Sequence, residues 1–134
     1  MKYMMDTNIC IYLIKRRPAE VVRRFLAQDP AELCISAVSY AELMHGVEKS
    51  QAPQKNRLAL SLLLSPLAIL PFDGRAAEEY GRIRAALERR GAPIGPMDLL
   101  IAAHARAAGL TIATNNTREF DRVDGLTVEN WAAP

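Results

Sequence analysis

Four carboxylates stand where a sheet of parallel strands would bring them together. Asp6 directly follows a short apolar run, and Glu42 lies shortly after a second one. Asp98 opens a long apolar segment, and Glu119 comes five residues after a third apolar run. Ligands of such sheets bind outside the carboxyl ends of the strands. The spacing therefore predicts that these four side chains converge on one edge of a sheet.

A cluster of carboxylates implies a particular chemistry, because like charges repel. Two carboxylates about 5 Å apart repel by roughly 3 kcal/mol at an effective dielectric constant near 20. Such a cluster persists by holding protons or by binding a cation. Oxygen ligands suit Mg²⁺ or Mn²⁺ rather than zinc, and a cation held in this way activates water against a phosphate. The chemistry indicated is metal-dependent hydrolysis of phosphodiester bonds.

Each carboxylate also has a purely structural interpretation. Asp6 is a suitable N-cap for the helix that follows it, and Ser39-x-x-Glu42 matches a capping box. Asp98 lies in the first turn of a helix, where the helix dipole favours any acid. Glu119 is compatible with a solvated surface position. Only the placement of all four after successive strands favours a common site.

Alternating apolar and amphipathic segments give the elements that would position these residues. Turn and cap residues such as Pro18, Gly91 and Gly109 separate the segments. The predicted strands are 2–5, 33–36, 67–72, 111–114 and 126–129. The predicted helices are 7–14, 18–28, 37–49, 54–64, 75–90 and 95–108, with a helical turn at 116–120. Strands that alternate with helices predict a parallel α/β sheet covered on both faces.

Composition limits the class of protein. The 134 residues fit one domain, and 50% hydrophobic with 24% charged residues is typical of a globular chain. No run of 18 apolar residues predicts a membrane span, and Asp6 interrupts any signal-peptide core; we expect a cytoplasmic protein. The two cysteines, Cys10 and Cys34, are expected in the core. The net charge of +2 is compatible with nucleic acid without establishing it.

The motifs together resemble a known family. The segments concerned are Met5-Asp6-Thr7-Asn8-Ile9, Ser36-Ala37-Val38-Ser39-Tyr40-Ala41-Glu42-Leu43, Ile94-Gly95-Pro96-Met97-Asp98-Leu99, Thr114-Asn115-Asn116-Thr117-Arg118-Glu119-Phe120 and Val128-Glu129-Asn130-Trp131. In order and spacing they resemble PIN-domain ribonucleases, and more specifically the VapC toxins of type II toxin–antitoxin systems. The resemblance covers nearly the whole chain. It implies one PIN domain over residues 1–134, folded as a three-layer α/β/α sandwich around a parallel sheet.

The resemblance also implies roles for individual residues. Asp6, Glu42 and Asp98 match the family's acidic metal ligands, and Glu119 stands at the fourth acidic position. These four are the expected catalytic residues, with Mg²⁺ or Mn²⁺ as cofactor. Thr7 and Asn8 match small polar residues that steady the first acid. Asn116 departs from the pattern, because many members have Asp there. Glu119, as a fourth metal-binding residue, and Asn116 are expected to orient the attacking water or a weaker metal.

The implied function is that of a toxin endoribonuclease inhibited by a VapB-type antitoxin. RNA is the expected substrate, with tRNA, and initiator tRNA in particular, as a candidate. Lys15, Arg16 and Arg17 are candidate RNA contacts. The family implies a homodimer and an antitoxin helix in an apolar groove. A DNA or structure-specific nuclease and a catalytically silent binding partner remain alternatives. A receiver-type signalling domain is disfavoured, because it needs an adjacent acid pair and a later lysine.

Overall fold

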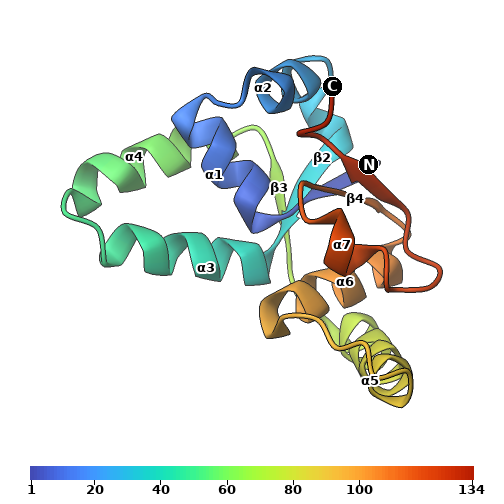
Figure 1. Ribbon diagram of the computed structural model, residues 1–134. Coiled ribbons are helices and arrows are strands. Elements are labelled where there is room, and N and C mark those ends of the chain that lie inside the picture. The colour runs from blue at the N-terminus through green and yellow to red at the C-terminus, as the bar shows by residue number, and fades with distance from the viewer.

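Five parallel strands form one sheet at the centre of the molecule. The computed structural model describes all residues from 1 to 134. The strands are β1 (Tyr3–Met5), β2 (Leu33–Ser36), β3 (Ala68–Leu70), β4 (Thr111–Thr114) and β5 (Val128–Asn130). Their order across the sheet is β3-β2-β1-β4-β5. The chain therefore builds one half of the sheet outward from β1 and then returns to build the other half, which leaves a switch point between β1 and β4 (Figure 1).

Seven α-helices connect and cover the strands. They are α1 (Thr7–Lys15), α2 (Ala19–Leu26), α3 (Ala37–Glu48), α4 (Pro53–Leu64), α5 (Gly74–Arg89), α6 (Pro96–Ala108) and α7 (Thr117–Phe120), with a 3-10 turn at Pro30–Glu32. Every predicted element is present, and most bounds agree within two residues. The strand predicted at 67–72 ends at Leu70, because Pro71 has no N–H to donate to a neighbouring strand. The last strand begins later than predicted, after a turn at Gly125.

The strands sort their side chains onto two cores, one on each face of the sheet. Tyr3 and Met5 point into the core beneath α1, α2, α3 and α4. Met4, between them, points into the core beneath α5, α6 and α7. On β4, Ala113 points into the first of these cores and Ile112 into the second. This period of two is the geometry of a strand buried on both faces, and it confirms the predicted three-layer α/β/α sandwich.

Helix α6 lies deeper than the other helices. Six of its thirteen residues are buried, including the run Ile101–Ala105. The sequence predicts this, because residues 99–103 are apolar on almost every side. Gly109 ends the helix with φ of 68°, a left-handed conformation that glycine adopts without strain. Cys10 and Cys34 are free thiols in the two cores, as predicted. No helix is long and apolar enough to cross a membrane.

Side-chain caps fix where the helices begin. Asp6 caps α1, Ser36 caps α3 and Asp73 caps α5, each accepting a hydrogen bond from a backbone N–H two or three residues later. The predicted capping box of Ser39 and Glu42 is absent, because α3 begins three residues earlier than that box requires. Glu42 is thereby left free of any capping role.

The last residues of the chain hold α2 in place. Trp131 is fully buried, and its indole N–H donates to Glu129 (3.0 Å). The same carboxylate accepts from the Tyr3 hydroxyl (3.1 Å) and faces Arg24 of α2 (3.6 Å). Arg24 also donates to the carbonyl of Ala133 (3.1 Å). The end of the chain, β1 and α2 are thus joined through one carboxylate and one guanidinium group.

Ser36 supports both α3 and α6, and this makes its hydroxyl important for stability. It accepts from the Val38 N–H (3.0 Å) and lies 2.7 Å from Nδ1 of the buried His104. We expect Ser36→Ala to lower the free energy of unfolding by about 2 kcal/mol, since it removes a cap and unpairs a buried nitrogen. Urea unfolding of the variant measures this. Asp29→Ala, which removes the cap of the exposed 3-10 turn, is the control and should cost less; equal costs would contradict the double role.

Candidate active site

A cleft of about 820 Å³ opens at the carboxyl ends of β1 and β2, between the first turns of α1 and α6 and one face of α3. Three of the four predicted carboxylates line it: Asp6, Glu42 and Asp98. Thr7 and Asn8 line it as well. The parallel sheet accounts for this convergence, because the strands before Asp6 and Glu42 end at the same edge, and α6 begins beside them.

Asp6 is the most deeply buried of these carboxylates, with 2% of its surface exposed. One oxygen accepts from the Ile9 N–H (2.9 Å), which makes it the N-cap of α1. The other accepts from the hydroxyl of Thr114, at the end of β4. Both strands that flank the switch point therefore position this carboxylate. The sequence analysis missed Thr114, although its position at the end of a predicted strand was a usable signal.

Asp98, Asn116 and Glu119 form one hydrogen-bonded group. The amide Nδ2 of Asn116 donates to Asp98 (2.9 Å) and to Glu119 (2.9 Å). Glu119 also accepts from the backbone N–H of Gly95 (2.9 Å), just before α6. Asn116 is itself held by the Thr114 hydroxyl, which accepts from its backbone N–H (2.8 Å). Neither Glu119 nor Asn116 lines the cleft; they contact it through Asp98.

Glu42 reaches the cleft from the second turn of α3. Its Oε1 accepts from the Thr7 hydroxyl at 2.6 Å. The sequence analysis assigned Thr7 to steadying Asp6, whereas the structure places its hydroxyl on Glu42. Thr7, the residue after Asp6, therefore orients Glu42. Asn8 lines the cleft.

Burial and neighbouring charges raise the pKa of two of these carboxylates, Asp6 and Asp98. Burial raises the pKa of Asp6 to about 6, and the charge of Glu42 adds to this against the hydrogen bonds from Thr114 and Ile9. Burial raises the pKa of Asp98 to about 7, with further contributions from its hydrogen bond to Glu119 and from the charges of Glu119 and Asp6. The pKa of Glu119 is lowered, because Asp98 shares its proton with it. None of these four carboxylates forms an ion pair with a lysine or arginine.

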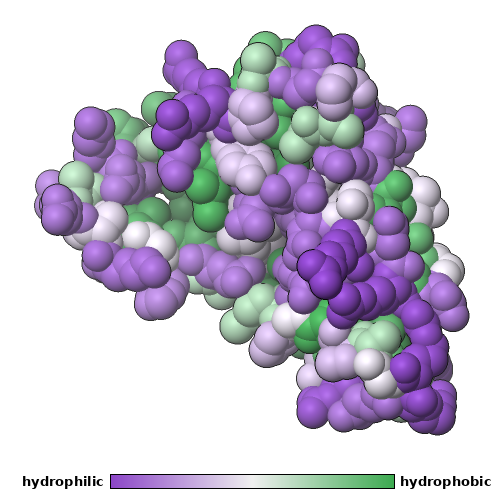
Figure 2. Space-filling model, in the orientation of Figure 1, coloured by the Kyte–Doolittle hydropathy of each residue, from purple (hydrophilic) through white to green (hydrophobic).

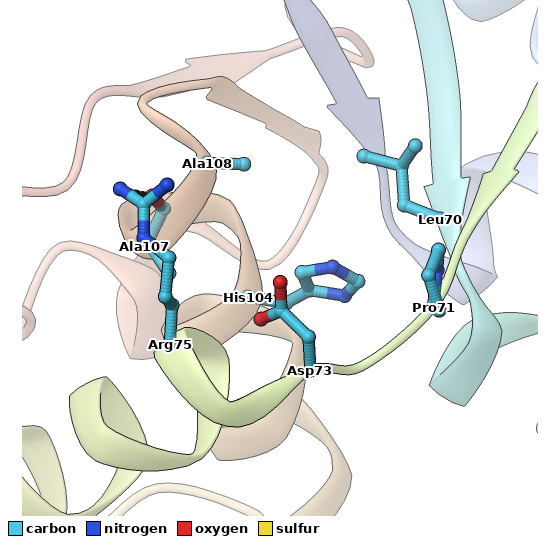
Figure 3. Close-up of a pocket in the computed structure, with 7 residues that line it drawn as sticks. All are labelled: Leu70, Pro71, Asp73, Arg75, His104, Ala107 and Ala108. Atoms are coloured by element: carbon cyan, nitrogen blue, oxygen red, sulfur yellow. Dashed lines mark hydrogen bonds between the residues drawn. The ribbon is translucent and has the colours of Figure 1, made fainter.

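A second hollow, of about 190 Å³, lies beside His104 and shares no residue with the cleft (Figure 3). The Asp73 carboxylate lies next to the imidazole ring there. Ser36, His104 and Asp73 are the residue types of a nucleophilic triad, but Ser36 is fully buried and caps α3. The His104 ring packs edge-on against Phe72 (5.4 Å between centroids), and burial lowers its pKa. His104 is a packed core histidine, as its apolar helix predicts.

The three basic residues proposed for RNA contacts lie away from the cleft. They follow the far end of α1, about 13 Å along the helix from Asp6. Lys15 and Arg17 line a shallow hollow with Tyr12, and Arg16 borders an apolar groove. Their contact with RNA stays a prediction.

Comparison with known proteins identifies the family. A PIN domain model matches residues 3–126. The tRNA(fMet)-specific endonuclease VapC of Shigella flexneri is 49% identical over 132 residues, which cover 98% of this chain and 99% of that protein. The chain belongs to the VapC family of PIN-domain ribonucleases. Ribonuclease VapC2 of Haemophilus influenzae is 47% identical over 131 residues, covering 98% of each chain.

Solved structures of VapC relatives have the same fold. The toxin–antitoxin complex VapBC of Salmonella typhimurium, in a crystal structure bound to DNA, contains a chain that matches with a TM-score of 0.92 at 44% identity, covering 98% of both chains. VapBC2 of Rickettsia felis, bound to a fragment of promoter DNA, matches with a TM-score of 0.89 at 41% identity, covering 98% of this chain and 99% of that one. These matches confirm the predicted family and fold class.

PIN-domain ribonucleases generally depend on a divalent metal, and the cleft of this VapC protein fits one. Its donors are carboxylate oxygens, the ligands preferred by hard cations, and they carry negative charge that no basic side chain neutralises. No three His, Cys, Asp or Glu side chains form a ready-made metal cluster. A cation that keeps several waters needs only one or two carboxylates from the protein, so the carboxylates that line the cleft would be enough to hold one.

The raised pKa values predict a pH-dependent stability when EDTA keeps cations away. A carboxyl group with a raised pKa in the folded state contributes stability that is fully present below its unfolded value near 4. This contribution is lost as the pH rises through about 6 for Asp6 and about 7 for Asp98. We expect the Tm of the EDTA-treated protein to fall between pH 5 and pH 8, and Asp98→Asn to reduce that fall.

The lowered pKa of His104 acts in the opposite direction. The difference between wild type and Asp98→Asn at each pH therefore isolates the carboxyl group, since both proteins contain His104. Equal slopes of Tm against pH in the two proteins would contradict the raised pKa of Asp98.

Proposed function

We propose that this protein is a VapC-type toxin, a single PIN domain that hydrolyses phosphodiester bonds of RNA with Mg²⁺ as its cofactor. The observation that carries the proposal is the meeting of Asp6, Glu42 and Asp98 in one cleft with no lysine or arginine paired to them. Mn²⁺ is the expected substitute for Mg²⁺, because it takes the same oxygen ligands.

Asp6 and Asp98 are the proposed ligands of the cation. When bound, the cation lowers the pKa of water and stabilises the charge that develops on the phosphate. Asp6 is held from two sides, by the Ile9 N–H and the Thr114 hydroxyl, so its carboxylate is fixed before substrate arrives. Asp98 is held by Asn116. This fixed geometry reduces the reorganisation that catalysis requires.

Glu42, Glu119 and Asn116 have supporting parts in the proposed reaction. Thr7 occupies Oε1 of Glu42, which leaves Oε2 to accept a hydrogen bond, and then the proton, from the attacking water. The water oxygen forms the new bond to phosphorus as the bond to the leaving oxygen breaks. Glu119 and Asn116 orient Asp98, and Glu119 shares the Asp98 proton when no cation is present.

The substrate class that we propose is tRNA. The support is the relative from Shigella flexneri, whose name specifies tRNA(fMet) and which is 49% identical over nearly the whole chain. We propose a cytoplasmic location as well, because a tRNA substrate would be met there. A DNA substrate and a purely binding role are the alternatives that a cleavage assay separates.

We expect Asp98→Asn and Asp6→Asn each to reduce cleavage of bulk tRNA by roughly 100-fold or more, because each removes a charge that holds the cation. Asn116→Ala should reduce it by about 10- to 100-fold, since it frees Asp98 to rotate. Gel assays of the antitoxin-free protein with Mg²⁺, with Mn²⁺ and with EDTA measure this.

Asp73→Asn is the matched control, because this carboxylate caps α5 outside the cleft and asparagine caps equally well. It should cleave like wild type. Cleavage that survives EDTA or Asp98→Asn would refute the metal site, and cleavage of DNA in place of RNA would refute the substrate class.

The second part of the proposal concerns the antitoxin. An apolar groove of about 520 Å³ lies between α1, α2 and α4. Figure 2 shows apolar surface in the hollow that opens beside α1 and α4. Leu26 is 73% exposed there and Leu62 is 69% exposed, although both are large apolar residues. Ile9, by contrast, lies in the core, and Leu13 belongs to that core while it also lines the floor of the groove. We propose that a VapB-type antitoxin inserts an apolar segment into this groove; VapB–VapC complexes of relatives support a partner of this kind. The homodimer stays a prediction.

We expect Leu26→Glu and Leu62→Glu each to weaken antitoxin binding by at least about 30-fold, because a charge would be buried in the apolar contact. Calorimetric titration with the antitoxin measures this. Leu58→Glu is the control, since Leu58 is 60% exposed on α4 but does not line the groove. All three variants should still cleave RNA. Unchanged antitoxin affinity in the groove variants would place the partner elsewhere.

A further inference from the structure

The carboxylate cleft continues along one face of α3. Besides Glu42, this helix contributes His45, Gly46 and Lys49 to the lining. These residues follow Glu42 at intervals of three, four and seven, the spacing of side chains on one helix face. Glu42 and Lys49 are two turns apart, about 10 Å along the axis. The cleft therefore extends well beyond the three carboxylates.

Lys49 is the only lysine or arginine that lines the cleft. Its side chain is exposed and forms no ion pair or hydrogen bond within the protein. The neighbouring Glu48 cannot neutralise it readily, because Arg57 of α4 holds that carboxylate at 2.7 Å. An uncompensated positive charge thus stands at the end of a cleft whose other end is strongly negative.

Gly46 keeps the cleft open between Glu42 and Lys49. Glycine within a helix lowers stability relative to alanine, so its presence calls for a reason. Packing is not that reason, because a Cβ added at Gly46 would meet nothing within 4 Å. Its φ is ordinary, so no backbone strain requires glycine either. A side chain at this position would project into the path along the helix.

We propose that this face of α3 is a second phosphate-binding subsite, in which the substrate strand passes over Gly46 and Lys49 binds a phosphate next to the scissile one. This inference rests on the proposed ribonuclease function. A lysine ammonium group is a strong point charge for a phosphate. The absent side chain at Gly46 lets the sugar–phosphate backbone approach the helix closely. The subsite orients a strand that the repelling carboxylates alone would not hold.

A simpler role for Lys49 is electrostatic stabilisation of the helix. It is the C-cap residue of α3, and a positive charge at a helix C-terminus interacts favourably with the helix dipole. The two roles differ in what they change. A helix-stabilising lysine affects Tm alone, whereas a phosphate ligand affects RNA affinity and its dependence on salt.

The first experiment measures binding of a fluorescein-labelled single-stranded RNA by anisotropy, in the Asp98→Asn background so that the probe stays intact. Each phosphate contact contributes about 0.7 to the slope of log affinity against log salt concentration for single strands. We expect Lys49→Ala to lower this slope by about 0.7, and Lys49→Arg to retain it. Lys55→Ala is the control, because Lys55 is an exposed lysine on α4 that does not line the cleft.

The second experiment uses Gly46→Ala in the otherwise unmodified protein. It should raise Tm by roughly 2–5 °C through better helix propensity, and should raise KM for bulk tRNA several-fold because its methyl group obstructs the strand. Gly81→Ala is the matched control, since Gly81 lies within α5 and also has nothing within 4 Å of an added Cβ. It should raise Tm in the same way and leave KM unchanged.

Two results would overturn the subsite. One is a salt slope for Lys49→Ala equal to that for Lys55→Ala. The other is a KM for Gly46→Ala equal to that for Gly81→Ala while wild type cleaves RNA. If wild type fails to cleave RNA at all, the proposed function fails and the subsite fails with it, so the two failures are distinguishable.

Discussion

Burial of neighbouring carboxylates without basic partners is the constraint around which this molecule is arranged, because burial first and mutual repulsion second disfavour their charges. Asp6, Glu42 and Asp98 are brought to one sheet edge by three separate segments, and no lysine or arginine is paired with them. Without a cation, the folded protein tolerates this arrangement by retaining protons, as the raised pKa values of Asp6 and Asp98 indicate. It also surrounds the carboxylates with donors. Most of these hydrogen bonds come from the hydroxyls of Thr7 and Thr114 and from the amide of Asn116.

Helix N-termini also offset the negative charge of the carboxylates. The same residues therefore have a structural role as well as the proposed functional role. Asp6 is a true N-cap of α1, and Asp98 lies in the first turn of α6. The positive ends of two helix dipoles therefore face the cleft. Capping does not compete with the metal binding that we propose for these residues. Asp6 accepts the Ile9 N–H with one oxygen and the Thr114 hydroxyl with the other, so its carboxylate is held in one orientation at the edge of the cleft.

Much of this arrangement follows from the sequence, for identifiable reasons. The strands and helices are predictable because each is bounded by a cap, a glycine or a proline, and the three-layer sandwich follows from their alternation. The meeting of Asp6 with Glu42 and Asp98 follows from parallel strands ending at one edge. Hydrogen bonds between side chains of distant segments cannot be predicted from the sequence in this way. The hydroxyl of Thr7 could serve either Asp6 or Glu42, and only the packing of α1 against α3 decides that it serves Glu42.

The sequence alone also does not show which basic residues of a helix lie near the cleft. The run Lys15–Arg17 attracts attention as a cluster of charge, yet it lies at the end of α1 away from the cleft. Lys49 is a single lysine in a polar stretch, and nothing in its local sequence distinguishes it. Its significance depends on α3 being oriented with Glu42, Gly46 and Lys49 toward the same cleft, which is a property of tertiary structure.

The bond between Glu129 and Arg24 has a consequence for how the toxin and its antitoxin change over evolution. Helix α2 forms one wall of the apolar groove, and its orientation is secured from behind by Glu129 and the Ala133 carbonyl. A substitution at Glu129 would remove one of the contacts that hold that wall, without altering any residue that lines the groove. If the antitoxin binds in the groove as we propose, discrimination among related antitoxins can drift through the C-terminal residues, and a comparison of groove residues alone would misjudge which toxins and antitoxins are compatible.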